Sequence, residues 1–206
     1  MERSYILHMF TPGKQMSPFD INMAVDAGYQ VVVPYCGVTL DEITGLTQDA
    51  IFSRGPKGVK ATGIFIGGRD VMLAADMLDA ARKAMVPPFE VSVIADPSGS
   101  YTTAAALVAC VEQLLRSAHG TEFAGKRVLI LGGTGTVGRI AGVGVMDKGK
   151  PIAGTQAVGI GALAVGNVKY QVENGLLVAM RQADKPLYLG FREAFAKARE
   201  LLANKS

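Results

Sequence analysis

The chain has 206 residues, of which 49% are hydrophobic and 19% charged, so it can bury one large core or two small ones and is not a disordered chain. The formal net charge of +3, with no run of Lys and Arg, argues against a nucleic-acid partner. A mild positive charge suits an anionic small molecule equally well.

Short apolar runs and one helical pattern alternate through the first third of the chain. Val and Ile dominate the runs, with little alternation of polar residues, which is typical of strands buried on both faces of a parallel sheet. The pattern predicts strands at Tyr5–Phe10, Gln30–Tyr35 and Thr62–Gly67. It also predicts a helix at Ser17–Ala27, with Pro18 at the favoured first helical position.

A second helix and a fourth strand follow. Apolar residues spaced three and four apart predict a helix from Val71 to Met85, which the pair Pro87-Pro88 ends. The apolar run at Phe89–Asp96 predicts the next strand. The same helical spacing recurs from Ala104 to Leu115, so another helix is expected there.

The limits of this third helix are marked by small and polar residues. Gly120 follows its end, and Ser100 or Thr102 is expected to cap its start. A fifth strand is predicted at Arg127–Gly132, and a final helix at Phe191–Leu202. After Gly132 glycine becomes frequent and helical periodicity is poor.

The predicted fold is therefore α/β: a mostly parallel sheet flanked by helices, with a strand–turn–helix near residue 130 and a C-terminal helix. No apolar run is long enough for a membrane helix, and the N-terminus does not resemble a signal peptide. The two cysteines and two histidines lack metal-ligand spacing, so no metal site is expected. Sparse cysteines suit a reducing compartment, and we expect a cytoplasmic protein.

The segment "KRVLILGGTGTVGRIAG" contains the pattern G-x-G-x-x-G at Gly133, Gly135 and Gly138. Directly after a strand, these glycines allow a tight turn, close approach of a pyrophosphate, and packing of helix on strand. The amides at the start of the following helix, at Thr136 and Val137, would then face phosphate.

The rest of a dinucleotide site is missing from its expected place. The group that reads the ribose should follow about 20 residues later, at the end of a second strand. There "PIAGT" offers neither a strand nor a charged residue. A glycine-rich strand–helix turn that holds no nucleotide therefore stays an equal alternative.

Polar residues crowd the end of the fourth predicted strand, in "ADPSGSYTTAAA". Open α/β sheets bind ligands at the carboxyl ends of their strands, so this loop is a candidate ligand site. Its donors and acceptors are Asp96, Ser98, Ser100, Thr102 and Thr103. Helix capping explains one or two of these residues, but not five.

Three other features have two interpretations each. The Gly67-Gly68 pair in "FIGGRD" ends a strand at the same edge, or is simply a tight turn. Asp20 could contact a ligand or favour the helix dipole. Lys169 could bind a ligand carbonyl or carboxylate, although the sequence around it, taken alone, favours a lysine that is simply solvated. Since no catalytic triad or carboxylate pair is evident, any catalysis is expected to work by positioning two reactants.

Four stretches together resemble one family: "LHMFTPGKQMSPFDINMAVDAGYQ", "LTQDAIFSRGPKGVKATGIFIGGRD", "PPFEVSVIADPSGSYTTAAA" and "VGIGALAVGNVKYQ". They are similar to the NAD(P)-dependent methylene-tetrahydromethanopterin dehydrogenases of methylotrophic bacteria. The resemblance implies a two-domain enzyme that passes a hydride from a methylene-pterin to NAD(P). It also implies a homo-oligomer.

The resemblance implies site residues as well. On the pterin side these are Asp20, the loop residues Asp96, Ser98, Ser100, Thr102 and Thr103, and Lys169, which would orient the pterin and is the catalytic candidate. On the NAD(P) side they are Gly133, Gly135, Thr136, Val137 and Gly138. A hydride transfer of this kind needs no protein acid or base.

The chain departs from the family at one point. Family members have many tens of residues between the segments that here meet at Gly142–Val143, so most of the Rossmann domain is expected to be missing. A natural deletion, an engineered truncation or an omission from the written sequence would each explain this. The implied organisation is a pterin-binding domain (1–125), a Rossmann remnant (126–158) and a returning C-terminal segment (159–206). The alternative function is a pterin-binding protein without a working NAD(P) site.

Overall fold

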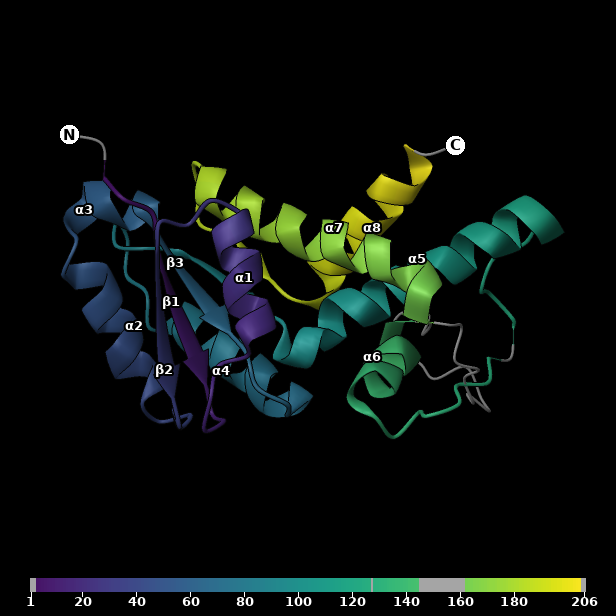
Figure 1. The fold of residues 1–206 in the computed structure, drawn as a ribbon, viewed down its shortest axis with the longest axis horizontal. Helices are drawn as coiled ribbons and strands as arrows, with labels where there is room; N and C mark the ends of the chain where they lie inside the picture. The colour runs from purple at the N-terminus through teal and green to yellow at the C-terminus, as the bar shows by residue number, and fades with distance from the viewer. Residues whose placement is uncertain (1–2, 127, 145–161, 205–206) are drawn as a thin grey trace. The chain divides into compact units, whose positions relative to one another are not determined.

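A computed structural model of the chain describes residues 3–126, 128–144 and 162–204 (Figure 1). Its contacts divide the chain into two compact units, and each is described here by itself. The sheet unit comprises Met1–Ser98 and Asn174–Gly190. The helical unit comprises Gly99–Glu173 and Phe191–Ser206.

The sheet unit is built on five parallel strands in the order β2-β1-β3-β4-β5. The strands are β1 (Ile6–Thr11), β2 (Val31–Cys36), β3 (Thr62–Ile66), β4 (Ser92–Ala95) and β5 (Tyr188–Leu189). The first four lie where the sequence predicts them, and the parallel α/β class is confirmed. β5 was not predicted, because two residues are too short a run to show a pattern.

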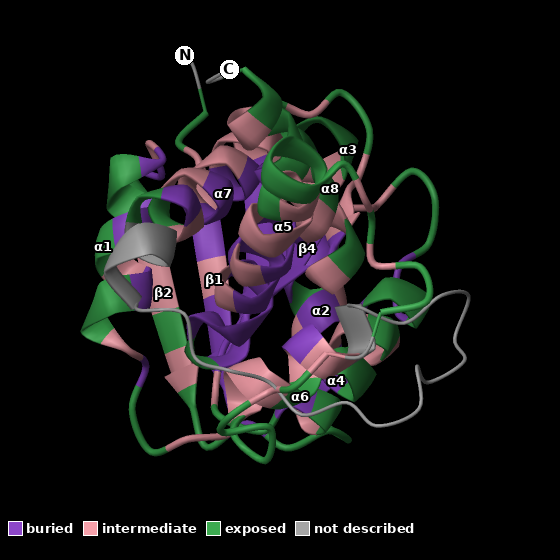
Figure 2. Cartoon of the chain, turned by 90° about the vertical axis from the view of Figure 1, so that its right-hand side faces the viewer, coloured by how far each residue is buried: buried purple, intermediate pink, exposed green. Residues whose placement is uncertain are grey.

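The centre of this sheet is buried on both faces. Every residue of β3 and β4 is buried, and buried residues follow the strands in Figure 2. Continuous burial explains why these runs lack polar alternation. At the edge, β2 is only partly covered, and Val31 is 39% exposed.

The connecting helices follow from the strand order. They are α1 (Pro18–Asp26), α2 (Ile43–Phe52), α3 (Gly55–Gly58) with a 3₁₀ turn at Val59–Ala61, and α4 (Val71–Lys83). The chain steps from β1 to β2 in one direction across the sheet, and from β2 to β3 and from β3 to β4 in the other. Because such crossovers are right-handed, α1 lies on one face of the sheet and α2 and α4 lie on the other. In agreement, α2 packs against α4.

Residues 174–182 of α7 (Ala162–Gln182) also pack on this sheet. Met180 Cε lies 3.4 Å from the position of a Cβ at Gly63, and the Arg181 guanidinium lies over the Tyr5 ring, 5.4 Å from its centroid. The sheet unit thus takes its last helix and its last strand from the C-terminal part of the chain.

The starts of α1 and α4 agree with the sequence, whereas the start of α5 (Ser100–His119) differs. Ser17 precedes α1 with Pro18 at its start, and Asp70 caps α4 by accepting from the amides of Met72 and Leu73. The N-cap of α5 is Gly99, and no side chain caps it, so the expected cap at Ser100 or Thr102 is wrong. Both residues lie inside the helix.

The helical unit packs α5 against α6 (Thr136–Gly144) and α8 (Phe191–Ala203). Ala104, Val108 and Ala141 form its small buried cluster. Partly buried hydrophobic residues surround that cluster: Leu107, Phe123, Val128, Ile130, Val137, Ile140, Phe191 and Phe195. α8 lies where the sequence predicts the final helix.

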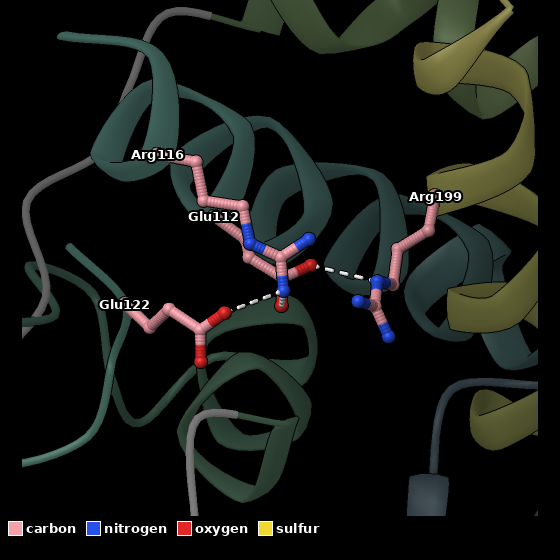
Figure 3. Close-up of polar contacts among 4 residues, drawn as sticks. All are labelled: Glu112, Arg116, Glu122 and Arg199. Atoms are coloured by element: carbon pink, nitrogen blue, oxygen red, sulfur yellow. Dashed lines mark hydrogen bonds and ion pairs between the residues drawn. The ribbon is translucent and has the colours of Figure 1, made fainter. Parts of the chain in front are cut away.

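Glu112 makes two ion pairs, one within α5 and one that joins α5 to α8 (Figure 3). One carboxylate oxygen lies 3.1 Å from Arg116 Nη2, and the other lies 2.8 Å from Arg199 Nε. Arg116 Nη2 also lies 3.0 Å from Glu122. The side chain of Glu112 is only 13% exposed, whereas that of Glu122 is 64% exposed. Glu112 is therefore the shared acceptor of the group.

The strand predicted at Arg127–Gly132 is wrong for the residues that the structure describes. Val128 and Leu129 have no regular secondary structure, Ile130 is a single bridge residue, and a turn begins at Leu131. Arg127 lies outside the described residues. A strand persists only with a neighbour to pair with, and the described part of the helical unit contains no strand.

Candidate functional site

The carboxyl edge of the sheet unit brings together three of the predicted site residues. Asp20 is 4% exposed in the first turn of α1. Its Oδ2 lies 3.6 Å from the position of a Cβ at Gly67, directly after β3. The amide of Gly67 donates to the carbonyl of Phe10 at 2.9 Å, so the end of β3 is tied to β1. Asp20 therefore lies at the carboxyl end of β3.

Asp96 and Ser98 lie at the adjacent strand end. Asp96 is fully buried, and its amide donates to the carbonyl of Ile66 at 3.0 Å. The Ser98 hydroxyl donates to the carbonyl of Gly68 at 2.8 Å. Gly68 has φ +109°, and a Cβ there would lie 3.0 Å from Pro12 Cδ. Gly68 is thus required by the turn, and Ser98 joins that turn to the end of β4.

Two successive residues at this edge have left-handed backbone. Ser98 has φ 53°, and Gly99, the first residue of the helical unit, has φ 63°. Among the described residues, Ser98 is the only non-glycine with positive φ. Such a conformation costs on the order of 1–3 kcal/mol and is concentrated at functional sites. The loop that the sequence singled out is therefore strained at its centre.

In the helical unit, two predicted residues hold the backbone of Gly99. The Thr102 hydroxyl donates to the Gly99 carbonyl at 3.3 Å, and the Thr103 hydroxyl donates to it at 2.5 Å. Ser100 and Thr102 are fully buried. These hydroxyl groups thus have a structural role at the start of α5, and a ligand role for them stays a prediction.

Lys169 reaches the same point from α7. A Cβ built on Gly99 would overlap its Nζ and Cε atoms, so the ammonium group lies directly against the Gly99 backbone. Gly99 is the N-cap of a 20-residue helix, whose N-terminus is the positive end of the helix dipole. Within the helical unit, the structure therefore brings Lys169 to Gly99, at the start of α5.

The sequence missed two residues of this arrangement. The sequence analysis gave Gly99 no role of its own, although a glycine between a strand and a long helix is a usable signal of left-handed backbone. Glu173 is fully buried and lies four residues after Lys169, hence on the same side of α7. A lone acidic residue in an apolar helix gave no comparable spacing signal.

The glycine turn keeps part of the geometry that phosphate binding requires. A Cβ at Gly138 would overlap the Gly132 carbonyl oxygen and Gly133 Cα, so only glycine permits this packing of helix on turn. The first helical hydrogen bond of α6 runs from the Arg139 amide to the Gly135 carbonyl at 3.0 Å. The amides of Thr136, Val137 and Gly138 precede that bond and lie at the helix N-terminus, where a phosphate fits.

Two other amides of the turn donate hydrogen bonds to carbonyls of the turn itself. The Gly133 amide donates to the Ile130 carbonyl at 3.2 Å, and the Gly135 amide donates to the Gly132 carbonyl at 2.9 Å. The segment expected to supply the ribose reader, Ile152–Thr155, lies outside the described residues. The described residues therefore fit a phosphate at the start of α6.

The residues that the structure describes contain neither a membrane-spanning helix nor a metal-binding cluster. No helix there is long and apolar enough to cross a membrane. Within the same residues, no three His, Cys, Asp or Glu side chains gather as a metal site would require.

Comparison with known proteins identifies related chains. The family "methylene-tetrahydromethanopterin dehydrogenase, N-terminal" matches residues 18–98, a range that contains Asp20, Asp96 and Ser98. The NAD(P)-dependent methylenetetrahydromethanopterin dehydrogenase of Methylorubrum extorquens is 37% identical, and the match covers 98% of this chain and 99% of that protein. The bifunctional protein MdtA of the same organism is 36% identical over 129 residues, which cover 63% of this chain and 43% of that protein.

The longer alignment shows a difference in length. It extends over 296 positions, at least 90 more than the 206 residues of this chain. At least 90 positions of the alignment therefore have no residue from this chain, although both ends of the relative are matched.

Proposed function

Because the chain belongs to the NAD(P)-dependent methylenetetrahydromethanopterin dehydrogenase family, we propose that it binds methylene-tetrahydromethanopterin and transfers a hydride from it to NAD(P). The full-length relative is named for this activity. The described residues support the pterin half of the proposal more fully than the nucleotide half.

The observation that carries the proposal is the position of the Lys169 ammonium group against Gly99, at the N-terminus of α5. An ammonium group and a helix N-terminus both favour an electron-rich oxygen atom. A pterin ring presents such an oxygen, its oxo group. We assign Lys169 to orient the ring by donating a hydrogen bond to it.

Within the sheet unit, Asp20 and Asp96 are the proposed hydrogen-bond acceptors for the pterin. A pterin ring also presents amino and ring N–H donors, and carboxylate oxygens accept hydrogen bonds from such groups. Both residues are buried at the carboxyl edge of the sheet, where parallel sheets bind ligands. Ser98, Ser100, Thr102 and Thr103 would then shape the loop that contacts the pterin.

The proposed reaction breaks the C–H bond of the methylene carbon. The hydrogen leaves with its electron pair, and the positive charge that remains is shared by the two pterin nitrogens. NAD(P), when bound, supplies the carbon that accepts the hydride. No protein group gains or loses a proton, so the contribution of this chain is to hold the ring in place. Thr136, Val137 and Gly138 would hold the phosphate by their amides.

A second candidate function is pterin binding without turnover. It is favoured by the missing positions of the alignment and by the lack of a strand at the described residues of 127–132. In this alternative, residues 1–125 bind the pterin, 126–158 are a remnant of the Rossmann domain, and 159–206 return to the first part. The gap then falls at Gly142–Val143.

Two further properties belong to this proposal. The family resemblance favours a homo-oligomer, and Leu131, which is 62% exposed, is the kind of apolar surface that a partner would cover. Light scattering tests this, and a clean monomer would contradict it. The cysteine content continues to favour a cytoplasmic location.

Calorimetry and a turnover assay separate the candidates. We expect tetrahydromethanopterin to bind, and NADPH absorbance to appear when methylene-tetrahydromethanopterin and NADP are both present. Pterin binding without NADP binding or turnover would support the second candidate. Failure to bind the pterin would reject both.

Lys169→Ala tests the assigned role of the lysine. Loss of a hydrogen bond from a charged donor costs roughly 1.5–3 kcal/mol, so we expect pterin affinity to fall at least tenfold. Lys197→Ala is the matched control, because this lysine of the same unit pairs with Glu200 at 2.8 Å. Equal affinities in the two variants would reject the assignment.

A further inference from the structure

We propose that Gly99 is a positioning residue, which determines where the Lys169 ammonium group lies and thereby sets pterin affinity. This inference rests on the proposed role of Lys169. It begins from one contact: a Cβ on Gly99 would approach Lys169 Nζ and Cε more closely than real Cβ atoms approach other atoms. The ammonium group therefore occupies the space that any other residue would fill.

The backbone of Gly99 cannot easily move away from the lysine. Its carbonyl accepts hydrogen bonds from the hydroxyls of Thr102 and Thr103, at 3.3 and 2.5 Å. Its φ of 63° directs the chain into a 20-residue helix. A side chain at this position would therefore displace the lysine rather than the loop.

The opposite end of the lysine is held by its helix. Val168 is 5% exposed and Val172 is fully buried, so the backbone of α7 around Lys169 is fixed by packing. The four-carbon stem of lysine is flexible, so its tip yields to a new Cβ more readily than backbone does. The expected effect of a Cβ at Gly99 is therefore a large change in the position of the ammonium group at a small cost in folding.

Gly120 provides a matched control at the other end of the same helix. It has φ 58°, almost the φ of Gly99, and beyond its chain neighbours no described residue has an atom within 4 Å of the position of its Cβ. Gly120→Ala thus introduces similar backbone strain without a clash. Comparing it with Gly99→Ala separates the position of Lys169 from the strain.

The experiment measures pterin affinity by calorimetry in Gly99→Ala, Gly120→Ala, Lys169→Ala and the double variant of Gly99 and Lys169. We expect Gly99→Ala to weaken binding at least tenfold and Gly120→Ala to change it less than twofold. The double variant should bind no more weakly than Lys169→Ala alone, because Gly99 acts through the lysine. Equal losses in the two glycine variants, or further loss in the double variant, would overturn the inference.

A second measurement does not require the pterin. Trace acetylation followed by peptide mass spectrometry gives the reaction rate of Lys169 relative to that of Lys197. We expect the relative rate to rise at least threefold in Gly99→Ala, since the ammonium group is displaced, and to stay unchanged in Gly120→Ala. If the wild-type chain binds no pterin, the proposed function fails, and this rate still decides the inference: a rise supports it and an unchanged rate overturns it.

Discussion

Two apolar runs of similar composition have different outcomes in the two units. In the sheet unit, Thr62–Ile66 forms the central strand β3, which is buried along its whole length. In the helical unit, Val128–Leu131 has no ladder, and Leu129 and Leu131 are 43% and 62% exposed. β3 has a neighbour on each side, whereas the described part of the helical unit offers none. A strand is therefore a property of its partners as well as of its own residues.

The glycine turn shows the opposite behaviour. Its hydrogen bonds join residues three apart, and Gly138 packs on Gly132 and Gly133, which are its near neighbours in the chain. Such a turn forms without a sheet beside it. The comparison thus separates local geometry, which persists in the helical unit, from sheet pairing, which does not.

The largest expected effect is on the core of the sheet unit. Phe65→Ala removes a side chain that is 1% exposed at the centre of the sheet, and should cost about 3–5 kcal/mol of stability. Phe195→Ala is the counterpart in the helical unit, where the ring is only partly buried, and should cost about half as much. Urea unfolding measures each loss, and hydrogen exchange by mass spectrometry assigns it to a unit. Equal losses would contradict the difference between the cores.

The next effect concerns the turn. Gly138→Ala introduces a Cβ that overlaps backbone atoms, which have no flexible side chain to yield, and should cost about 2–3 kcal/mol. Among the described residues, Gly142→Ala on the same helix meets Ile130 Cδ1 at 3.6 Å, an ordinary contact. It should stabilise the helix by about 0.5–1 kcal/mol. Thermal unfolding measures both, and destabilisation by Gly142→Ala would show that the end of α6 is packed more tightly than the structure indicates.

The ion pairs of the helical unit should contribute less. Glu112→Gln removes the shared partner of Arg116 and Arg199, and we expect a loss of about 1 kcal/mol, because both arginines are partly exposed. Glu122→Gln removes one exposed pair and should cost below about 0.5 kcal/mol. Unfolding at low and high salt measures the difference. A larger loss for Glu122→Gln would place the main acceptor of the group elsewhere.

The smallest expected effect is a pH dependence in the sheet unit. Burial, and secondarily the charge of Arg54, lower the pKa of His8 below its ordinary value of 6.5. The unfolded chain therefore binds this proton first as the pH falls, and stability decreases below about pH 6.5 and is regained above it. His8→Gln should flatten the stability profile measured by urea unfolding between pH 5 and 8.

Tyr35→Phe is the control for this prediction. It removes the hydroxyl that lies 3.1 Å from His8 Nδ1 but keeps the ring that helps to bury the histidine. Since burial is the main cause of the lowered pKa, the pH dependence should persist in Tyr35→Phe. Its disappearance would assign the effect to the hydrogen bond.

The sequence predicted the parallel sheet because β1 to β4 are short, continuous apolar runs with helices between them. It predicted the loop after β4 as a ligand site, and the structure brings Asp96 and Ser98 to that edge beside Gly68. It could not predict β5, which pairs with β4 from a distant part of the chain. The spacing of residues could not predict the contact between Lys169 and Gly99 either, because the two are seventy positions apart in the chain. The predicted domain limits stay a prediction.

The pairing of β4 with β5 has a consequence for the history of this chain. About 90 residues separate the two strands. If the missing positions of the alignment fall within that connection, as proposed, a relative would close a loop about twice as long. Doubling a loop changes the entropy of closing it by only about 0.6 kcal/mol. The gain or loss of a whole nucleotide-binding segment is thus nearly neutral for the sheet, so evolution could remove it in one step while the pterin half kept its fold.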